Sequence, residues 1–320
     1  MSITIGTEAD AQNYAQVNQA SWDARAEAHA QSAMYNLAAY RADTNYISDI
    51  VRFDLPRLPP LQDMRIVHLQ CHIGTDTLSL ARLGAASVTG LDFSPESLKQ
   101  ARLLADSVPD PSGWKVSYVQ GDVYDSVALL GREAFDLVFT GIGALCWLPS
   151  VERWANVVAD LLKPGGRFFI REGHPILWGL DDSNVTETYP AEQLRVIYPY
   201  FESGLPLVTA EGLSYVDDDV ATGTDVDNVE EAPSAAVLDP QGTLASPTPA
   251  KRTIEFNHGL AETVQALINS GLRITLVEEH DSVPWNALRG RMEKAELGEY
   301  RLLQGRERIP LTYTIVAFKE

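Results

Sequence analysis

The sequence VHLQCHIGTDT (Val67–Thr77) has the pattern of a buried strand that runs into a tight turn and then into a helix. In an α/β protein such a turn lies at the carboxyl end of a parallel strand, where nucleotide-like cofactors bind. These turns are usually rich in glycine because the backbone approaches the ligand closely. Here Gly74 is the one glycine, and a glutamine, a cysteine and two histidines crowd the rest of the turn. The stretch is therefore an altered cofactor loop, a metal site or an ordinary strand end.

Short apolar segments alternate with helical segments around this turn. The predicted strands cover residues 64–70, 86–92, 115–122, 134–141, 167–172, 272–280 and 311–319, and the predicted helices cover 75–84, 94–106, 150–166 and 259–271. The helix at 94–106 has an expected N-cap, Ser94, followed by Pro95 at the first helical position. Apolar strands that alternate with helices indicate a parallel sheet covered on both faces. The predicted fold class is α/β, with a doubly wound sheet.

The alternation has two interruptions, which suggest a domain organisation. Residues 10–50 have a helical pattern, and three prolines within five residues end it at 56–60. We expect an N-terminal helical lid over 1–58 and a core formed by 59–174 together with 257–320. Residues 175–256 are expected to be an inserted cap that is partly disordered, above all at 217–250, because they are polar and acidic.

The composition limits the possible partners. The chain has 320 residues, 45% of them hydrophobic, two cysteines and a formal net charge of −19. This charge repels phosphate backbones and anionic lipid, so we expect a small-molecule substrate and neither a nucleic acid nor a membrane partner. The few cysteines, and an N-terminus without the features of a secretory signal, favour a cytoplasmic protein. The sequence leaves a homodimer open.

Two carboxylates follow the next two predicted strands. Asp92 ends the second strand and could accept both ribose hydroxyls of an adenosine cofactor. Asp122 ends the third strand and could take the adenine amino group, while the backbone N–H of Val123 serves a ring nitrogen. The alternative for either carboxylate is a cap on the helix that follows it.

The turn itself offers the N-terminus of the helix that begins near Thr75, which is a good anion site. A dinucleotide cofactor would place a pyrophosphate there and would need the motif G-x-G-x-x-G, which is absent. A smaller anion, such as an amino acid carboxylate, tolerates bulkier side chains. Adenosine joined to an amino acid carboxylate describes S-adenosylmethionine (SAM).

With these features the chain resembles the class I SAM-dependent methyltransferases. The first motif of that family falls on His68, Gln70, His72 and Gly74, and its helix-to-fifth-strand signature on LLKPGGRFFI at 161–170. The fourth-strand motif is FDLVFTGIGALCWL at 135–148. LQCHIG, together with NHGL at 257–260, is similar to a bacterial subgroup with an LQCHxG first motif. The resemblance implies a seven-stranded, mostly parallel sheet whose last strand is antiparallel.

The resemblance also implies SAM as the cofactor and S-adenosylhomocysteine (SAH) as its product. The residues expected to bind the cofactor are Trp22, Arg25, Gln70, His72, Gly74, Asp92, Phe93, Asp122, Val123, Thr140 and Gly141. Trp22 and Arg25 would belong to a lid over the cofactor, where an aromatic face attracts the sulfonium. Trp22 could instead be packing core of its helix.

Transfer to an oxygen or a protonated nitrogen needs a base, and we expect these acceptors in preference to carbon. His174, after the fifth strand, and His258, before the sixth-strand helix, are the expected catalytic residues, with Glu172 as a third choice. Each histidine could instead be a cap or a loop residue. Trp147 and Trp178 could line an aromatic acceptor pocket or form part of the core of the cap.

Three other hypotheses follow from the same residues. A metal site at His68, Cys71 and His72 is not expected, because the spacing fits no common zinc pattern and alternate strand residues diverge. A nicotinamide-dependent oxidoreductase would need the pyrophosphate loop that is missing here. A protein that binds SAM without transferring a methyl group is the remaining alternative, because the first motif is altered.

Overall fold

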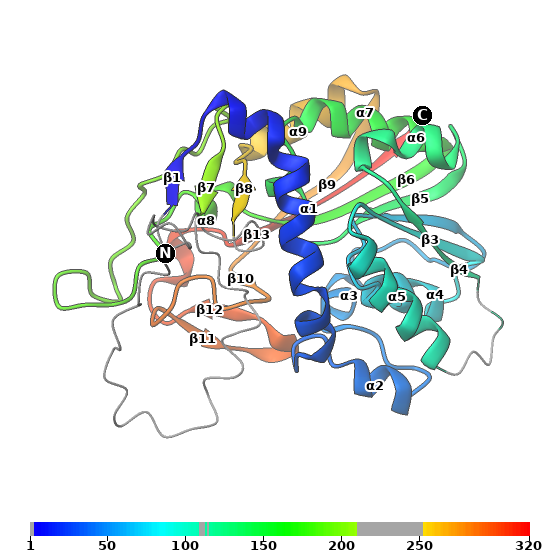
Figure 1. Ribbon diagram of the computed structural model, residues 1–320, viewed down its shortest axis with the longest axis horizontal. Coiled ribbons are helices and arrows are strands. Elements are labelled where there is room, and N and C mark those ends of the chain that lie inside the picture. The colour runs from blue at the N-terminus through cyan, green and yellow to red at the C-terminus, as the bar shows by residue number, and fades with distance from the viewer. Residues whose placement is uncertain (1–2, 109–112, 114, 210–251) are drawn as a thin grey trace, which may run out of the picture.

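The computed structural model describes residues 3–108, 113, 115–209 and 252–320 (Figure 1). The disorder expected at 217–250 lies outside the described residues. A seven-stranded sheet forms the centre of the fold, with the strand order β4-β3-β2-β5-β6-β13-β9. Its strands are β2 (Arg65–Leu69), β3 (Ser87–Asp92), β4 (Val116–Gln120), β5 (Phe135–Thr140), β6 (Leu162–Gly173), β9 (Leu272–His280) and β13 (Thr312–Lys319).

Strands β2 to β6 pair in parallel, and β13 is antiparallel to both of its neighbours, β6 and β9. The predicted α/β fold, with an antiparallel last strand, is therefore confirmed. One boundary differs slightly: the helix at 150–166, which Pro164 and two glycines were expected to end, already ends at Leu161. Pro164 cannot continue a helix, and Leu162 instead pairs with Phe135 as the start of β6.

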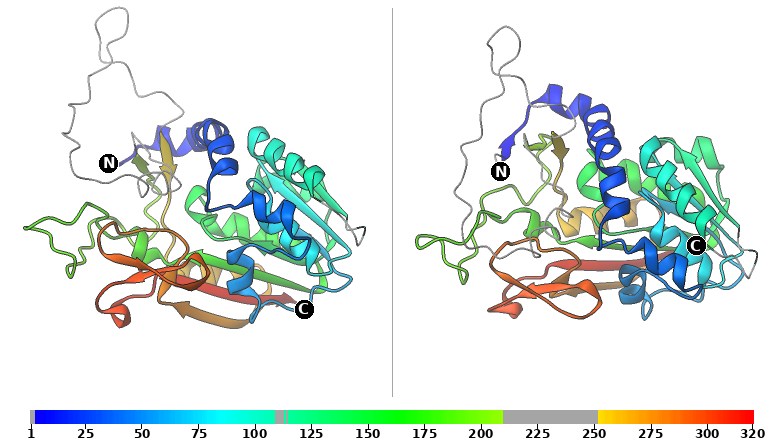
Figure 2. Two further views of the ribbon diagram at one scale, coloured as in Figure 1. Left: turned by 90° about the horizontal axis from the view of Figure 1, so that it is seen from below. Right: turned by 60° about the horizontal axis from the view of Figure 1, so that its bottom comes forward.

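Helices cover both faces of this sheet (Figures 1 and 2). On one face lie α3 (Asp49–Asp54) and α4 (Thr75–Arg82), and α5 (Pro95–Ser107) follows β3. On the other face lie α6 (Ser126–Leu130), α7 (Val151–Leu161) and α9 (Leu260–Asn269). The apolar side chains of α7 and α9 pack around the buried Trp154, whereas those of α4 pack on Phe139 and Phe169. Burial of two such cores supplies most of the stabilisation of an α/β domain.

The N-terminal segment is helical, as expected, but it is divided into α1 (Glu8–Gln31), α2 (Leu37–Ala42) and α3. Thr7 and Asp10 form a capping box that begins α1. In Figure 1, α1 runs down the middle of the view, between α5 and a small antiparallel sheet. The strand order of that sheet is β1 (Ile3–Ile5), β7 (Leu207–Thr209) and β8 (Thr253–Glu255).

This small sheet joins the lid to the inserted cap, which the sequence did not predict. The buried side chain of Asn18 on α1 donates a hydrogen bond to the carbonyl of Ile254 (2.8 Å) and accepts one from its N–H (2.9 Å). The apolar side chains of Val208, Ile254 and Phe256 pack against α1. Lid and cap therefore share one hydrophobic core.

A second insertion, residues 281–311, lies between β9 and β13. It contains β10 (Ser282–Val283), β11 (Met292–Lys294) and β12 (Tyr300–Leu302), which pair in the order β10-β12-β11. Its apolar side chains pack against Leu177 on α8 (Pro175–Trp178) and against Leu180. The buried Arg291 binds the carbonyl oxygens of Ser183 and Gln193. Residues 175–209 and 281–311 thus pack together.

Four short 3-10 helices complete the described elements: η1 (Val123–Asp125), η2 (Leu145–Trp147), η6 (Glu296–Gly298) and η7 (Arg306–Arg308). Of the helices that the structure describes, none combines the length with the apolar character that crossing a bilayer requires.

Candidate cofactor site

The turn after β2 has an unusual backbone. Gln70, His72 and Gly74 all have positive φ angles, of 55°, 49° and 76°. Only glycine enters this left-handed region without a penalty, and other residues cost about 1–2 kcal/mol each. A Cβ at Gly74 would lie 2.6 Å from the Tyr118 hydroxyl oxygen, so Gly74 is also required by its neighbours. The turn therefore keeps the shape of a glycine-rich loop, although two of the three positions are not glycine.

Neighbouring strands hold the turn in this shape. The N–H of Cys71 donates to the carbonyl of Leu91 (3.0 Å), and the N–H of His72 donates to Asp92 Oδ2 (2.8 Å). Asp92 Oδ1 accepts from the N–H of Ser94 (2.9 Å), while Ser94 itself is the N-cap of α5. Burial raises the pKa of Asp92 to about 6. The ribose role of Asp92 stays a prediction, and each of its oxygens keeps lone-pair capacity for a further donor.

The expected adenine residues lie at the end of β4. Asp122 caps η1 by accepting a hydrogen bond from the N–H of Tyr124 (2.8 Å), and Val123 is buried in the core. The cap alternative is thus observed here, and the adenine role of Asp122 stays a prediction.

Helix α1 covers the turn. The ring of Trp22 lies 4.9 Å from the ring of His72 and 5.2 Å from that of Trp147, measured between centroids. The Gln19 side chain donates to the carbonyl of Phe93 (2.6 Å), and the Ser94 hydroxyl donates to Asp23 (2.6 Å). These contacts hold α1 over the turn and over the end of β3, and its role as a lid over a cofactor stays a prediction.

The His72 ring contacts helices α1 and α5. Its Nε2 lies 2.8 Å from His29 Nδ1, and its Nδ1 lies 3.0 Å from Ser97 Oγ. Burial lowers the pKa of His72 well below its usual range and that of His29 to about 4, so both rings are neutral at pH 7. The charge of Arg25 on α1 adds to the lowering at His29. Burial raises the pKa of Glu255 on β8, and the charge of Arg25 partly opposes this rise.

The loop after β5, Gly141–Leu148, is held from three directions. Gly141 begins this loop, directly after the buried Thr140. Glu172 accepts hydrogen bonds from the N–H groups of Gly143, Ala144 and Leu145, each at 2.8 Å, and from that of Gly173 at 2.6 Å. Both oxygens of Glu172 are thus occupied in holding the loop, and its role as a base stays a prediction.

Two further anchors complete the loop. The Gln70 amide donates to the carbonyl of Ala144 (2.9 Å), which joins the loop to the turn. The N–H of Phe256 donates to the carbonyl of Cys146 (2.7 Å), which joins the loop to the cap. The indole N–H of Trp147 donates to the carbonyl of Gly143 (2.8 Å), which fixes the aromatic ring beneath α1.

Both expected catalytic histidines are buried; both ring nitrogens of His258 have a hydrogen-bond partner, whereas His174 Nε2 faces the Glu279 carboxylate without a well-formed hydrogen bond. His174 Nδ1 accepts from the N–H of Ile176 (3.1 Å), and its Nε2 lies 2.9 Å from a Glu279 oxygen. His258 Nε2 lies 2.7 Å from the carbonyl oxygen of Leu148, and its Nδ1 lies 2.9 Å from Glu202. Burial lowers the pKa of His174. These contacts make His174 the cap of α8 and His258 a bonded loop residue, as the alternatives to catalysis expect. The catalytic roles of both histidines stay predictions.

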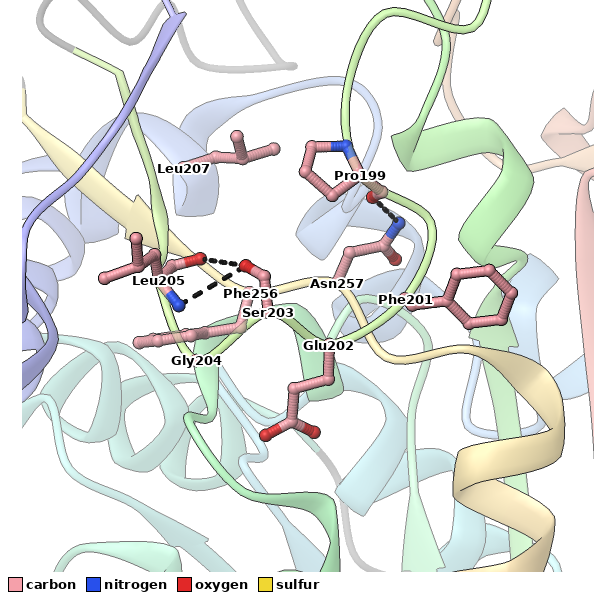
Figure 3. A pocket seen from close by; sticks show the side chains of 9 residues that line it. All are labelled: Pro199, Phe201, Glu202, Ser203, Gly204, Leu205, Leu207, Phe256 and Asn257. Carbon is pink, nitrogen blue, oxygen red and sulfur yellow. Dashed lines mark hydrogen bonds between the residues drawn. The ribbon is translucent and has the colours of Figure 1, made fainter.

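The segments that carry the two histidines do converge, as expected. The Asn257 side chain donates to the carbonyls of Pro175 and Pro199, both at 2.9 Å. Figure 3 shows the second of these bonds at the wall of a pocket in the cap, between Phe201 and Leu207. That pocket lies against the cap sheet and is not lined by residues of the turn.

Trp178 and the residues considered for a metal site contact neighbouring residues of the protein. Trp178 stacks on Trp285 of the second insertion, 5.8 Å between centroids, so it packs within the cap. His68 Nδ1 bonds to the Thr77 hydroxyl (2.9 Å), and the Cys71 sulfur lies beside Gly90. Within the described ranges, the structure brings together no three histidine, cysteine or acidic side chains that could hold a metal ion.

Buried polar atoms at the site without a hydrogen-bond partner in the described part of the chain include Gln70 Oε1 in the turn, Thr140 Oγ1 at the end of β5 and the Tyr118 hydroxyl beside Gly74. An unpaired buried oxygen costs about 1–3 kcal/mol, and native proteins rarely leave one without a function. The Gln70 and Thr140 oxygens, the left-handed turn and the carboxylate of Asp92 fit a ligand that has an ammonium and two hydroxyl groups.

Comparisons with known proteins agree with this geometry. Residues 67–170 match the model of a family described as a methyltransferase domain. The chain is 22% identical to an S-adenosylmethionine dependent methyltransferase from Mesorhizobium loti, with a TM-score of 0.55 over 85% of this chain and 98% of that one. A solved structure from Listeria monocytogenes gives a TM-score of 0.56 at 20% identity, with the same coverage. The fold is the Rossmann-like methyltransferase fold.

Curated relatives match about a third of the chain. Methyltransferase phqN of Penicillium fellutanum is 31% identical over 114 residues, which is 35% of this chain and 32% of that protein. The ubiquinone biosynthesis O-methyltransferase of Serratia proteamaculans is 34% identical over 119 residues, which is 37% of this chain and 46% of that protein. The chain thus spans less than half the length of these curated relatives.

Sequence reasoning missed Asp76, in the first turn of α4, although it lies within the quoted stretch. It also missed Asn18 and the second insertion. The sequence did contain a signal for Asp76. A carboxylate two residues after the last glycine of a cofactor turn lies at the carboxyl edge of the sheet.

Proposed function

We propose that this protein is a SAM-dependent methyltransferase that acts on a small molecule. The observation that carries the proposal is the left-handed turn at Gln70, His72 and Gly74, with Asp92 at the end of the neighbouring strand, in a methyltransferase fold. SAM supplies a methyl group that is already activated by a sulfonium. The protein then has to bind, orient and shield the two reactants.

Each predicted contact has a chemical reason. The N–H groups at the start of α4 would face the SAM carboxylate. The unpaired oxygens of Gln70 and Thr140 would accept from its ammonium. Asp92 would accept from the ribose hydroxyls, and Asp122 with the N–H of Val123 would hold the adenine.

Four further residues would enclose the cofactor. Phe93 and Gly141 would line its two sides, at the ends of β3 and β5. His72 would contact it from the turn. Trp22 would close over the sulfonium with a cation–π contact, and the aromatic rings of His72 and Trp147 already position Trp22 in the structure. Arg25 would lie beside it on the lid.

The acceptor would be an oxygen or nitrogen nucleophile, as proposed from the sequence. The net charge of −19 supports a small-molecule acceptor over a nucleic acid or a lipid surface. We assign the chain to the bacterial subgroup with the LQCHxG first motif, acting in the cytoplasm, and a homodimer is compatible with this function. For His174 or His258 to serve as the base, the ring must first release a nitrogen from Glu279 or from Glu202.

The test has two steps. Calorimetric titration with SAM and SAH, with NADH as the control, separates this proposal from a nicotinamide-dependent oxidoreductase. Incubation with SAM and a panel of phenols, carboxylates and amines, followed by measurement of SAH, separates a transferase from a protein that binds SAM without turnover. We expect binding of SAM and SAH but not NADH, and SAH formation with at least one class of acceptor. NADH binding, or SAM binding without SAH formation across the panel, would contradict the proposal.

A further inference from the structure

Asp76 and His68 lie together beside the loop after β5. A Cβ added to Gly141 would lie 3.3 Å from His68 Nε2 and 3.7 Å from Asp76 Oδ2. These two side chains therefore lie close against the backbone of Gly141, where the loop begins. Asp76 is partly exposed, whereas His68 is buried, and within the described residues His68 Nε2 makes no hydrogen bond. A carboxylate and an imidazole thus lie side by side against Gly141, at the carboxyl edge of the sheet.

The strand order shows which end of the cofactor these two side chains would meet. In the sheet, β4 and β3 lie on one side of β2, and β5 and β6 lie on the other. The proposed adenosine contacts, Asp122 and Asp92, end β4 and β3. The sulfonium end would therefore point across β2 towards β5, where Gly141 begins the loop. Asp76, from the first turn of α4, borders the loop at this end.

We propose that Asp76 is the catalytic carboxylate that binds the acceptor's hydroxyl or amine and takes up its proton during methyl transfer. This inference rests on the proposed function. In the step, a bond forms between the acceptor oxygen or nitrogen and the methyl carbon as the bond between that carbon and the sulfonium sulfur breaks. Sulfur keeps the electron pair and becomes a neutral thioether. The acceptor's proton passes to the Asp76 carboxylate and from there to water.

The surroundings of Asp76 suit this role. Burial raises its pKa to about 6, while a hydrogen bond with Ser48 opposes the shift. A base with a pKa near the working pH combines a high deprotonated fraction with a useful proton affinity. The other ionisable groups that face it are Tyr40 on α2, Asp54 on α3 and His68 on β2. Each is neutral at pH 7, because burial lowers the pKa of His68 to about 3 and raises those of Tyr40 and Asp54.

The alternative bases are less available. His258 is bonded at both ring nitrogens, His174 Nδ1 accepts a backbone hydrogen bond while its Nε2 faces Glu279, and Glu172 is occupied by four N–H groups. Asp76 is a partly exposed residue and lies next to the loop that begins at Gly141.

The test uses two probes that differ at the reacting centre, where sinefungin has a carbon bearing an amine and SAH has only the sulfur. Sinefungin has a protonated amine at that place, and SAH has none. We expect Asp76→Asn to weaken sinefungin binding about tenfold or more at pH 7.5, the effect of losing a charge-assisted hydrogen bond. SAH affinity should change by less than about twofold. Asp106→Asn, on the exposed surface of α5, is the matched control and should change neither affinity.

The unmodified protein supplies a second readout that does not depend on a variant. Its preference for sinefungin over SAH should fall as the pH is lowered from 7.5 to 5, because Asp76 becomes protonated. Titration of Asp92 affects both probes alike and cancels in the ratio. The same pH dependence should persist in Asp54→Asn, which excludes the neighbouring carboxyl as its source.

Failure of the Asp76 inference and failure of the proposed function would give different results. If the wild-type protein binds SAH but shows a sinefungin-to-SAH ratio that neither Asp76→Asn nor pH changes, the role of Asp76 is refuted and the proposed cofactor survives. If the wild-type protein binds neither probe, the proposed function fails, and the role of Asp76 fails with it.

Discussion

Replacing Glu172 with glutamine should destabilise the protein strongly, because this side chain organises the loop after β5. The carboxylate is buried and accepts four backbone hydrogen bonds, from Gly143, Ala144, Leu145 and Gly173. A glutamine keeps one acceptor oxygen, which can serve two of these N–H groups. Its NH₂ group would face the other two donors and leave them unpaired.

The expected magnitude follows from those two lost bonds. A hydrogen bond to a charged group contributes about 1.5–3 kcal/mol, so two of them contribute about 3–6 kcal/mol. Burial raises the pKa of Glu172, which means that the buried charge itself carries a cost that the neutral amide relieves. We therefore expect Glu172→Gln to lower the free energy of unfolding by about 3 kcal/mol.

Urea unfolding followed by tryptophan fluorescence and linear extrapolation measures this change. Glu187→Gln is the matched control, because Glu187 is exposed in the cap, and it should change stability by less than about 0.5 kcal/mol. SAH affinity should fall in Glu172→Gln as well, since the loop holds Gly141 beside the turn. A loss of less than about 1 kcal/mol would refute the assigned role of Glu172.

Three further predictions test other parts of the structure. Gln70→Gly should be more stable than Gln70→Ala by about 1 kcal/mol in urea unfolding, because φ is 55° and both variants lose the same side chain; equal stabilities would rule out the left-handed turn. Asn18→Ala should cost about 2–4 kcal/mol and speed hydrogen exchange at the Ile254 amide, whereas the exposed Asn13→Ala should do neither; an unchanged exchange rate would contradict the link between lid and cap. Burial raises the pKa of Asp54 from 3.8 to about 8. The protonated Asp54 carboxyl therefore stabilises the folded protein fully below pH 3.8. This stabilisation is lost as the pH rises to about 8, at about 1.4 kcal/mol per pH unit. Between pH 5 and pH 8, Asp54→Asn should therefore gain about 4 kcal/mol relative to the wild type in urea unfolding; parallel pH profiles would disprove the shift.

The central sheet could be predicted because its signals are local. Each parallel strand is a short apolar run next to a helix with a readable cap, as at Ser94 and Ser150, whose side chains accept from the expected N–H groups. The cap could not be predicted in the same way. Its strands are three residues long or shorter, and Ile3–Ile5 pairs with Leu207–Thr209, so nothing near either segment indicates its partner.

The candidate site also has one part that the sequence predicts and one part that it does not. The sequence identified the turn and Asp92 because their spacing follows from a strand, a turn and a helix. It did not show that Gln70 and His72 adopt the left-handed region, since this depends on hydrogen bonds from β3 and on contacts with α1. The histidines at 174 and 258 were expected at the sheet edge, where they lie. Their partners, Glu279 and Glu202, come from segments that no sequence pattern connects to them.

The most direct test of the cofactor site is calorimetric titration of SAH into the wild-type protein and into Asp92→Asn, with Asp106→Asn as the control. Circular dichroism confirms first that each variant is folded. Micromolar binding to the wild type and the control, with affinity at least about tenfold weaker in Asp92→Asn, is the result that the account predicts. An absence of binding to the folded wild type, or equal affinity in Asp92→Asn, would contradict it.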